Sequence, residues 1–253
     1  MALIASRSSQ QNYHDEARLI PRPKRSTPEA ISHRGAHDTL PENSIPAFLR
    51  ALELGAQGIE LDVHATQDGK VVVHHDPVVR GRRILKKKSR AIADLSARDL
   101  ESFPLADGIQ IPSLDEVLEA VRQRAIVYVE IKAPHIELLV VRCIRESSAT
   151  CAVHSFDHRA VKNVKSILPA IRTGVLESER QVDPVAWLLE TRAEDLWQQA
   201  DYIDEELVRS AHSLNARVVA WTSNDPRQWK TLNALGVDAI CTDRIGELAA
   251  FSW

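Results

Sequence analysis

From Ile31 onward, short apolar runs alternate with segments that have the periodicity of amphipathic helices. The apolar runs have the length of buried strands, and nearly all of them are separated from the next by one helical segment. The predicted strands cover 30–33, 58–63, 126–132, 150–156, 172–176, 201–203, 217–222 and 239–243. The predicted helices include 43–54, 113–123, 136–146, 158–167, 204–214 and 226–235.

Eight strands separated by helices are typical of a closed parallel barrel, the α/β TIM (β/α)8 fold. A doubly wound open sheet is the alternative, but its Gly-rich turn after the first strand is missing, because "HRGAHDTLPEN" has one glycine there. We therefore predict a single barrel domain over residues 29–253. Residues 1–28 are polar and interrupted by prolines, which predicts an extension that is mobile or packs on the outside.

The run "KVVVHHD" has to be treated separately, because only "ATQDG" lies between it and the strand at 58–63. That spacing is too short for a parallel crossover. Asp68-Gly69 is a strong signal for a two-residue hairpin turn, which would place His75 opposite Asp62. The pattern therefore predicts a hairpin that extends the second strand at the barrel mouth and returns His75 to the face of Glu60 and Asp62.

Composition excludes several classes of protein. The chain has 253 residues, 26% of them charged, and a net charge of −3, which is unlike a general nucleic-acid binder or a disordered acidic chain. Its three cysteines form no disulfide framework or zinc spacing, and this favours a reducing compartment. The sequence has neither an apolar run of about 18 residues nor a signal-peptide pattern, so we expect a cytoplasmic protein.

The carboxyl ends of barrel strands form the working face of this fold. Glu60 and Asp62 end the second strand, and Glu130 ends the next one in "VYVEIKAP". Three carboxylates at one mouth repel each other unless a cation lies among them. Oxygen ligands favour Mg²⁺ or Ca²⁺ over zinc, so the spacing predicts one such divalent cation.

Basic groups lie beside this predicted metal site. Arg34 follows the first strand and Lys132 follows Glu130, and both suit an anion rich in oxygens, above all phosphate. His33 and His75 have side chains that exchange protons near neutral pH. The combination predicts metal-assisted cleavage of a phosphoester.

Seven motifs resemble those of glycerophosphodiester phosphodiesterases, a family with a TIM barrel related to phosphatidylinositol-specific phospholipase C. They cover the chain from about Ile31 to Leu248. In order, they are "HRGAHDTLPENSIPAF", "GIELDVHATQDGKVVVHHDP", "IPSLDEVL", "VEIK", "SFDH", "AWTSND" and "GVDAICTDR".

The resemblance implies hydrolysis of diesters such as glycerophosphocholine or glycerophosphoethanolamine to glycerol 3-phosphate and an alcohol, with one divalent cation, usually Ca²⁺ or Mg²⁺. It places acid–base catalysis on His33 and His75. The implied metal ligands are Glu60, Asp62 and Glu130, and the implied substrate contacts are Arg34, Lys132 and Trp221. Glu42 is expected to support the metal site without binding the ion directly.

Two other functions stay open at this point. A lysophospholipase D acting at a membrane surface would need an apolar rim at the mouth, and a silent barrel that binds phosphorylated ligands would not need intact catalytic histidines. The run "RGRRILKKKSR" at 80–90 could attract anionic lipid head groups, but we favour a solvated loop. We expect a small-molecule diester as the partner and no nucleic acid.

Overall fold

The computed structural model describes residues 27–80, 89–183 and 185–253. Most of the predicted extension at 1–28 and of the basic run at 80–90 therefore lies outside the described residues. Eight parallel strands form a closed barrel in the order β1-β11-β10-β9-β8-β7-β6-β2, and β1 pairs with β2 to close it. The strands are β1 (Glu29–His33), β2 (Gly58–Ala65), β6 (Ile126–Ile131), β7 (Thr150–Ser155), β8 (Arg172–Glu177), β9 (Asp195–Gln199), β10 (Arg217–Trp221) and β11 (Ala239–Thr242).

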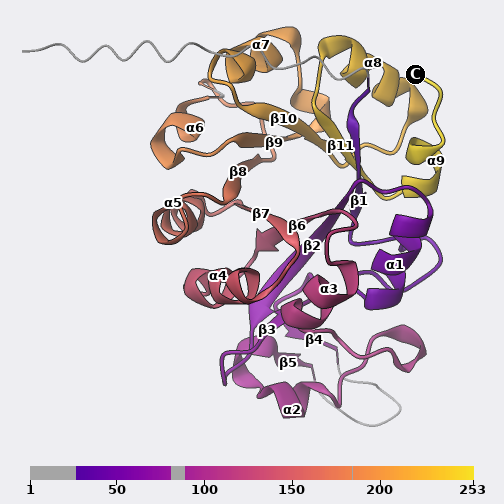
Figure 1. The fold of residues 1–253 in the computed structure, drawn as a ribbon, viewed down its shortest axis with the longest axis vertical. Coiled ribbons are helices and arrows are strands. Elements are labelled where there is room, and N and C mark those ends of the chain that lie inside the picture. Colours follow the sequence, from indigo (N-terminus) through magenta and orange to yellow (C-terminus); the bar gives the residue numbers. More distant parts are fainter. Residues whose placement is uncertain (1–26, 81–88, 184) are drawn as a thin grey trace, which may run out of the picture.

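Helices surround the strands, as Figure 1 shows, and the closed barrel confirms the predicted TIM fold. They are α1 (Ile45–Glu53), α3 (Leu114–Val121), α4 (Glu137–Glu146), α5 (His158–Ile167), α6 (Ala186–Thr191), α7 (Glu205–Ser213), α8 (Pro226–Leu235) and α9 (Ile245–Ala249). Side chains fix several of the helix starts; for example, Ser113 and Glu116 form a capping box at α3. No helix in the described ranges is long and apolar enough to cross a membrane.

One predicted strand is wrong. Residues 201–203 lie in a short 3-10 helix, η4 (Ala200–Tyr202), and its C-terminal cap, and the sixth barrel strand is β9, six residues earlier. The pattern "DLWQQ" looks too polar for a strand because Gln198 lies on its outer face. Gln198 is nevertheless buried, and its amide donates to the carbonyls of Glu177 and Glu179. This local hydrogen bonding offsets the cost of burying the amide.

Alternate residues of the strands fill the barrel interior. Trp197 is buried there and stacks on the ring of His154, with ring centroids 4.2 Å apart. Gly174 on the neighbouring strand makes this arrangement possible, because a Cβ at that position would lie 2.8 Å from the indole of Trp197. The apolar part of the interior is a small cluster of Ile31, Tyr128, Ala152, Leu176, Trp197, Val219, Ala239 and Cys241.

The predicted hairpin exists, but its register is shifted by one residue. Strand β3 (Val71–Val73) runs antiparallel to β2 and pairs Val63 with Val73. The turn holds three residues, because Thr66 pairs with Lys70 and Gly69 adopts a positive φ of 81°. A left-handed glycine at this position is typical of the three-residue hairpin loop. His75 therefore does not reach the mouth by strand alternation; the chain bends after Val73 and carries it there.

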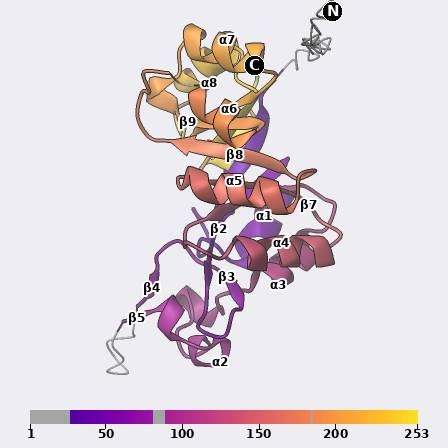
Figure 2. The ribbon, with the colours of Figure 1, turned by 90° about the vertical axis from the view of Figure 1, so that its left-hand side faces the viewer.

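A small unit follows the hairpin and lies at the end of the molecule opposite α7 and α8 (Figure 2). It contains β4 (Val78–Val79), β5 (Arg90–Ala91), the 3-10 helices η2 (Ile92–Asp94) and η3 (Ala106–Gly108), and α2 (Ala97–Leu100). Its hydrophobic cluster is separate from the barrel core and comprises Val72, Val79, Ile92, Leu95, Leu100 and Phe103. The segment after His75 is thus held in place by packing of its own.

Charged residues are buried at the amino-terminal end of the barrel. Arg217 pairs with Glu29 at 2.7 Å and lies 4.0 Å from Asp195. The carboxylate oxygens of Asp195 are buried and have no hydrogen bond from the described residues. Burial raises the pKa of Asp195 to about 6, although Arg217 partly opposes the shift. This carboxyl group therefore opposes folding when it is charged.

We expect Asp195→Asn to gain stability relative to the wild type as the pH rises from about 4 to about 7. Over this range the native carboxyl retains a proton that the unfolded chain loses, so wild-type stability falls with rising pH. Asparagine does not ionise, and the difference in unfolding free energy should shift by up to about 3 kcal/mol towards the variant. Urea titrations at several pH values measure it. The exposed Asp107→Asn is the control, and equal pH dependence of both variants would contradict the prediction.

Candidate active site

The predicted site residues of the barrel strands gather at one cavity of about 120 Å³ in the mouth. His75 reaches the same cavity from the bend after β3. Asp62 lies beneath it, fully buried and in contact with two of the lining residues. The lining is His33, Arg34, Glu60, His75, Glu130, Lys132, His154, Phe156, Leu176, Trp197, Trp221 and Cys241.

Three buried side chains in this cavity could hold a metal ion. Donor atoms of Glu60, Glu130 and His154 lie within 4.8 Å of one another, and Asp62 is not part of this group. Burial and the nearby carboxylates of Asp62 and Glu130 raise the pKa of Glu60 well above its usual value. Burial is the main cause that raises the pKa of Glu130 to about 7, and the nearby charge of Asp62 is the second. Burial lowers the pKa of His154 to about 3, so its ring is neutral and able to act as a ligand.

Polar atoms at this point lack hydrogen bonds. Glu60 Oε1, Asp62 Oδ1 and His154 Nδ1 are buried, and no described residue forms a hydrogen bond with them. Unsatisfied buried polar atoms are costly, and native proteins rarely contain several in one place. A divalent cation among them would satisfy the oxygens and offset the carboxylate repulsion. The residues present therefore fit a metal ion.

Two cations border the carboxylates. Arg34 Nε lies 3.0 Å from Asp62 Oδ2, and Lys132 Nζ lies 3.1 Å from Glu130 and 3.5 Å from Asp62. Burial alone would raise the pKa of Asp62, but Arg34, Lys132 and a hydrogen bond from Asn43 outweigh burial and lower it. Asp62 is thus ionised, and it fixes both cations at the cavity edge. Their positive charge can bind an anion there.

Glu42 supports the site through Arg34. Its carboxylate accepts hydrogen bonds of 3.4 Å from Arg34 Nη1 and is half-exposed. Arg34 itself has a positive φ of 56°, which turns its backbone so that the N–H donates to the carbonyl oxygen of Glu60 at 3.0 Å. Glu42 therefore contacts a cation and not the donor atoms of the candidate metal site.

His33 is held by a carboxylate that sequence reasoning did not select. Its Nδ1 lies 2.6 Å from Asp243 Oδ1, and its Nε2 lies 3.9 Å from Glu60. His37 Nε2 and Asn224 Nδ2 also bond to Asp243, at 2.9 Å and 2.7 Å. Burial would raise the pKa of Asp243, but the hydrogen bonds from His33, His37 and Asn224 hold it below its usual value. A charged Asp243 fixes the orientation of the His33 ring and leaves Nε2 available.

His75 has a carboxylate partner of its own, since its Nδ1 lies 2.9 Å from Asp76 Oδ1. Its backbone is fixed by His64, whose Nε2 lies 3.1 Å from the carbonyl oxygen of His75. Burial lowers the pKa of His64, so this ring is neutral and donates one hydrogen bond. Both predicted catalytic rings therefore present Nε2, with Nδ1 oriented by an aspartate.

Aromatic side chains form another part of the cavity lining. Phe156 and Trp221 pack edge to face, with ring centroids 5.5 Å apart. Trp221 Nε1 is buried and donates to no described residue, although buried indole N–H groups usually find a partner. This donor is available to a bound molecule.

The residues of the site that sequence reasoning missed include His37, His154, Asn224 and Asp243. Position along the strands could have found two of them. Asp243 directly follows β11, and His154 shares the inward face of β7 with Ala152. Asn224 and His37 lie on loops, and no strand periodicity points to them.

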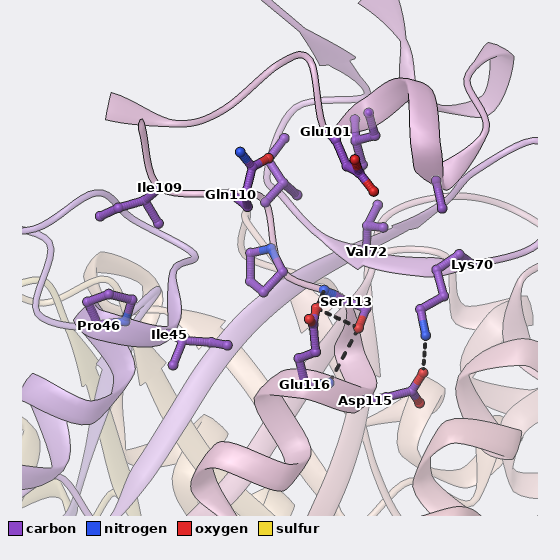
Figure 3. A pocket seen from close by; sticks show the side chains of 14 residues that line it. Ile45, Pro46, Lys70, Val72, Glu101, Ile109, Gln110, Ser113, Asp115 and Glu116 are labelled. Atoms are coloured by element: carbon purple, nitrogen blue, oxygen red, sulfur yellow. Dashed lines mark hydrogen bonds and ion pairs between the residues drawn. The ribbon is translucent and has the colours of Figure 1, made fainter. Parts of the chain in front are cut away.

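A larger cavity of about 780 Å³ lies between α1, α3, β3 and the small unit (Figure 3). Some of its polar groups already have partners: Lys70 pairs with Asp115 at 2.6 Å, and Glu116 accepts from Ser113. Apolar residues such as Ile45, Val72 and Ile109 fill much of the remaining wall. Among the described residues, none of its side chains has a buried polar atom without a hydrogen bond, whereas the mouth has several, so the chemistry belongs to the smaller cavity.

Residues 33–247 match the model of the glycerophosphoryl diester phosphodiesterase family. The chain is 33% identical to a glycerophosphodiester phosphodiesterase of Caldanaerobacter subterraneus, over 84% of this chain and 93% of that protein. A Bacillus altitudinis protein of the same name is 32% identical with the same coverage. The chain belongs to this family. It is a phosphoric diester hydrolase with glycerophosphodiester phosphodiesterase activity.

Solved structures of similar proteins share the fold. A putative glycerophosphoryl diester phosphodiesterase of Silicibacter pomeroyi has a TM-score of 0.80 at 23% identity, covering 88% of this chain and 92% of its own. A glycerophosphodiester phosphodiesterase of Parabacteroides distasonis has a TM-score of 0.78 at 25% identity, with 88% and 95% covered. A phosphodiesterase of Oleispira antarctica, solved with the product sn-glycerol-3-phosphate, has a TM-score of 0.78 at 23% identity, with 88% and 95% covered.

In this phosphodiesterase, Asp243→Asn should lower kcat by roughly 10- to 100-fold with little change in KM. An amide cannot stabilise a proton on the His33 ring as a carboxylate does, and it can select the wrong tautomer. Steady-state kinetics measure the changes in kcat and KM separately. His37→Leu is the matched control, because leucine has no N–H to donate to Asp243 and the hydrogen bond between Asp243 and His33 remains. If the two variants lose activity equally, orientation of His33 by Asp243 is not important.

Proposed function

We propose that this phosphodiesterase hydrolyses diesters such as glycerophosphocholine or glycerophosphoethanolamine to glycerol 3-phosphate and an alcohol. The observation that carries the proposal is the set of unsatisfied atoms of Glu60, Asp62 and His154 beside Arg34 and Lys132. Acidic ligands for a cation and cations for a phosphate occur together there. The product in the Oleispira antarctica structure supports the same chemistry.

We propose Glu60, Asp62 and Glu130 as the ligands of one Mg²⁺ or Ca²⁺ ion. Carboxylates are the ligands that both ions prefer. Asp62 Oδ1 accepts no hydrogen bond from the described residues and lies 3.5 Å from Lys132 Nζ, whereas Oδ2 bonds to Asn43; we therefore assign Oδ1 to the ion. His154 adjoins the site as a neutral ring. When bound, the ion neutralises the diester and polarises its phosphorus.

The protein's own groups bind and orient the diester. Arg34 and Lys132 contact the phosphoryl oxygens, and Glu42 holds Arg34 in place for that contact. Trp221 Nε1 donates to a hydroxyl at the glycerol end of the substrate, and the Phe156 ring packs against the indole. These contacts exclude water and position the phosphorus between the two histidines.

His33 acts as the base and His75 as the acid. His33 lies deeper, with Asp243 stabilising its protonated form, whereas His75 also lines a second cavity where a departing alcohol can lie. His33 removes a proton from the nucleophile while His75 protonates the leaving oxygen. Either water or the adjacent glycerol hydroxyl can be the nucleophile. Only attack by the hydroxyl gives a cyclic phosphate, so trapping of that intermediate distinguishes them.

The proposal is tested by incubating the purified protein with glycerophosphocholine and Mg²⁺ or Ca²⁺ and measuring glycerol 3-phosphate. Release of this product is expected. A silent phosphate-binding barrel would bind the diester without turnover. A long-chain lysophospholipid in parallel tests the lysophospholipase D alternative, and faster turnover of that substrate would replace the proposal.

A further inference from the structure

A second cavity of about 420 Å³ adjoins the mouth on the side of His75. His75 lines this cavity and also the cavity at the mouth that contains the proposed metal ligands, so it lies where the two cavities meet. The proposed function has His75 giving its proton to the leaving oxygen. An alcohol that departs past His75 enters the second cavity.

Apolar side chains form about half of the lining of this cavity. Val78, Val79, Phe103, Leu105 and Ile111 line it, and all belong to the small unit after the hairpin. Val79 and Phe103 are members of that unit's buried cluster, with Ile111 packed against it, so the wall is firmly supported. Val78 is 38% exposed, although it is a large hydrophobic residue. An exposed apolar side chain beside a catalytic histidine is suited to contact with an apolar ligand.

The polar groups in the lining already have partners. Glu42 pairs with Arg34, Asn43 bonds to Asp62, and the carboxylate of Asp76 accepts from His75. His74 Nδ1 bonds to the carbonyl oxygen of Asp76, and Arg80 lies 3.9 Å from the carboxylate of Asp76. A molecule in this cavity would therefore gain more from apolar contact than from new hydrogen bonds.

We propose that this cavity binds the leaving alcohol and favours one with an apolar alkyl body over a small hydrophilic alcohol. The inference rests on the proposed function and assigns its alcohol specificity to the small unit. The nucleophile forms the new P–O bond and gives its proton to His33. The bond from phosphorus to the alcohol oxygen breaks, and that oxygen takes its proton from His75.

The test uses glycerol phosphodiesters of straight-chain alcohols from methyl to hexyl, with the glycerol diester as the hydrophilic comparison. We expect kcat/KM to rise by up to about fourfold per methylene as each carbon is buried, and to level off when the cavity is full. Val78→Asp and Leu105→Ser should flatten this rise, so that the ratio of kcat/KM for the hexyl diester to that for the methyl diester falls in each variant. Leu138→Asp is the control, because Leu138 is exposed and does not line this cavity.

A rise with chain length that both cavity variants flatten supports the inference. A flat or falling series in an enzyme that cleaves the methyl diester overturns it and leaves the proposed function intact. The inference is also overturned if the rise persists in both cavity variants, or if Leu138→Asp flattens it equally. If none of the diesters is hydrolysed, the proposed function is overturned, and the inference with it.

Discussion

His75→Ala is expected to slow hydrolysis of glycerophosphocholine by about 10²- to 10⁴-fold and to leave a p-nitrophenyl diester of glycerol phosphate much less affected. The choline alkoxide is a poor leaving group and needs a proton from His75, whereas p-nitrophenolate departs without one. His33→Ala should slow both substrates, because both need the proton removed from the nucleophile. Measuring kcat for the two substrates in the two variants separates the acid from the base.

A suitable control for these variants is His135→Asn. His135 is an exposed histidine in the loop after β6, and its positive φ of 65° is one that asparagine tolerates. It should retain wild-type rates with both substrates. Equal losses on both substrates in His75→Ala would mean that His75 is not the acid. Near wild-type turnover in both catalytic variants would remove the histidines from the mechanism altogether.

Removal of divalent metal with a chelator should lower activity by about 10³-fold or more, and Mg²⁺ or Ca²⁺ should restore it. Without a cation, the buried carboxylates of Glu60 and Glu130 are protonated more easily, and Arg34 and Lys132 alone face the diester. Glu60→Gln keeps the shape of the side chain but removes its charge. The variant should not recover activity when metal is added back.

Thermal unfolding gives a second measure that does not depend on turnover. At a metal concentration of about 100 Kd, the wild type should gain about 2.7 kcal/mol of stability. Glu60→Gln should lose this gain, whereas Glu146→Gln, which changes an exposed carboxylate on α4, should retain it. An unchanged metal response in Glu60→Gln would contradict the site.

A pair of variants asks which third residue completes the metal site. Asp62→Asn should weaken Mg²⁺ and Ca²⁺ binding if the ligands are all oxygens. His154→Gln should weaken it instead if the group of Glu60, Glu130 and His154 holds the ion. Metal titrations followed by unfolding temperature distinguish the two. Weaker metal binding in Asp62→Asn agrees with our proposal.

The sequence was most informative where a residue's role follows from its place along a strand. Side chains two apart at a strand end share one face whatever the neighbouring strands do, so Glu60 with Asp62, and Glu130 with Lys132, were predictable as pairs. Parallel strands of a barrel bring their carboxyl ends together, so these pairs were predicted to meet. The cavity at the mouth contains the members of those pairs or lies directly over them.

Tertiary structure decided what depends on register and on contacts between distant segments. The shifted hairpin shows that His75 reaches the mouth by a bend, because a glycine in the left-handed region makes the turn one residue longer than a two-residue loop. Asp243 meets His33 from 210 positions away. Burial neutralises His154, and no local pattern of residues reveals this.

By itself the sequence determined the barrel, its working end and the pairs of charged side chains there, because strand periodicity is a local property of the chain. Closure of the barrel decided the partners of His33 and His75, the position of His154 beside Glu60 and Glu130, and the cavity next to His75. Those features arise when segments far apart in the chain exclude water together, and the energy of a buried charge depends on all of its neighbours at once.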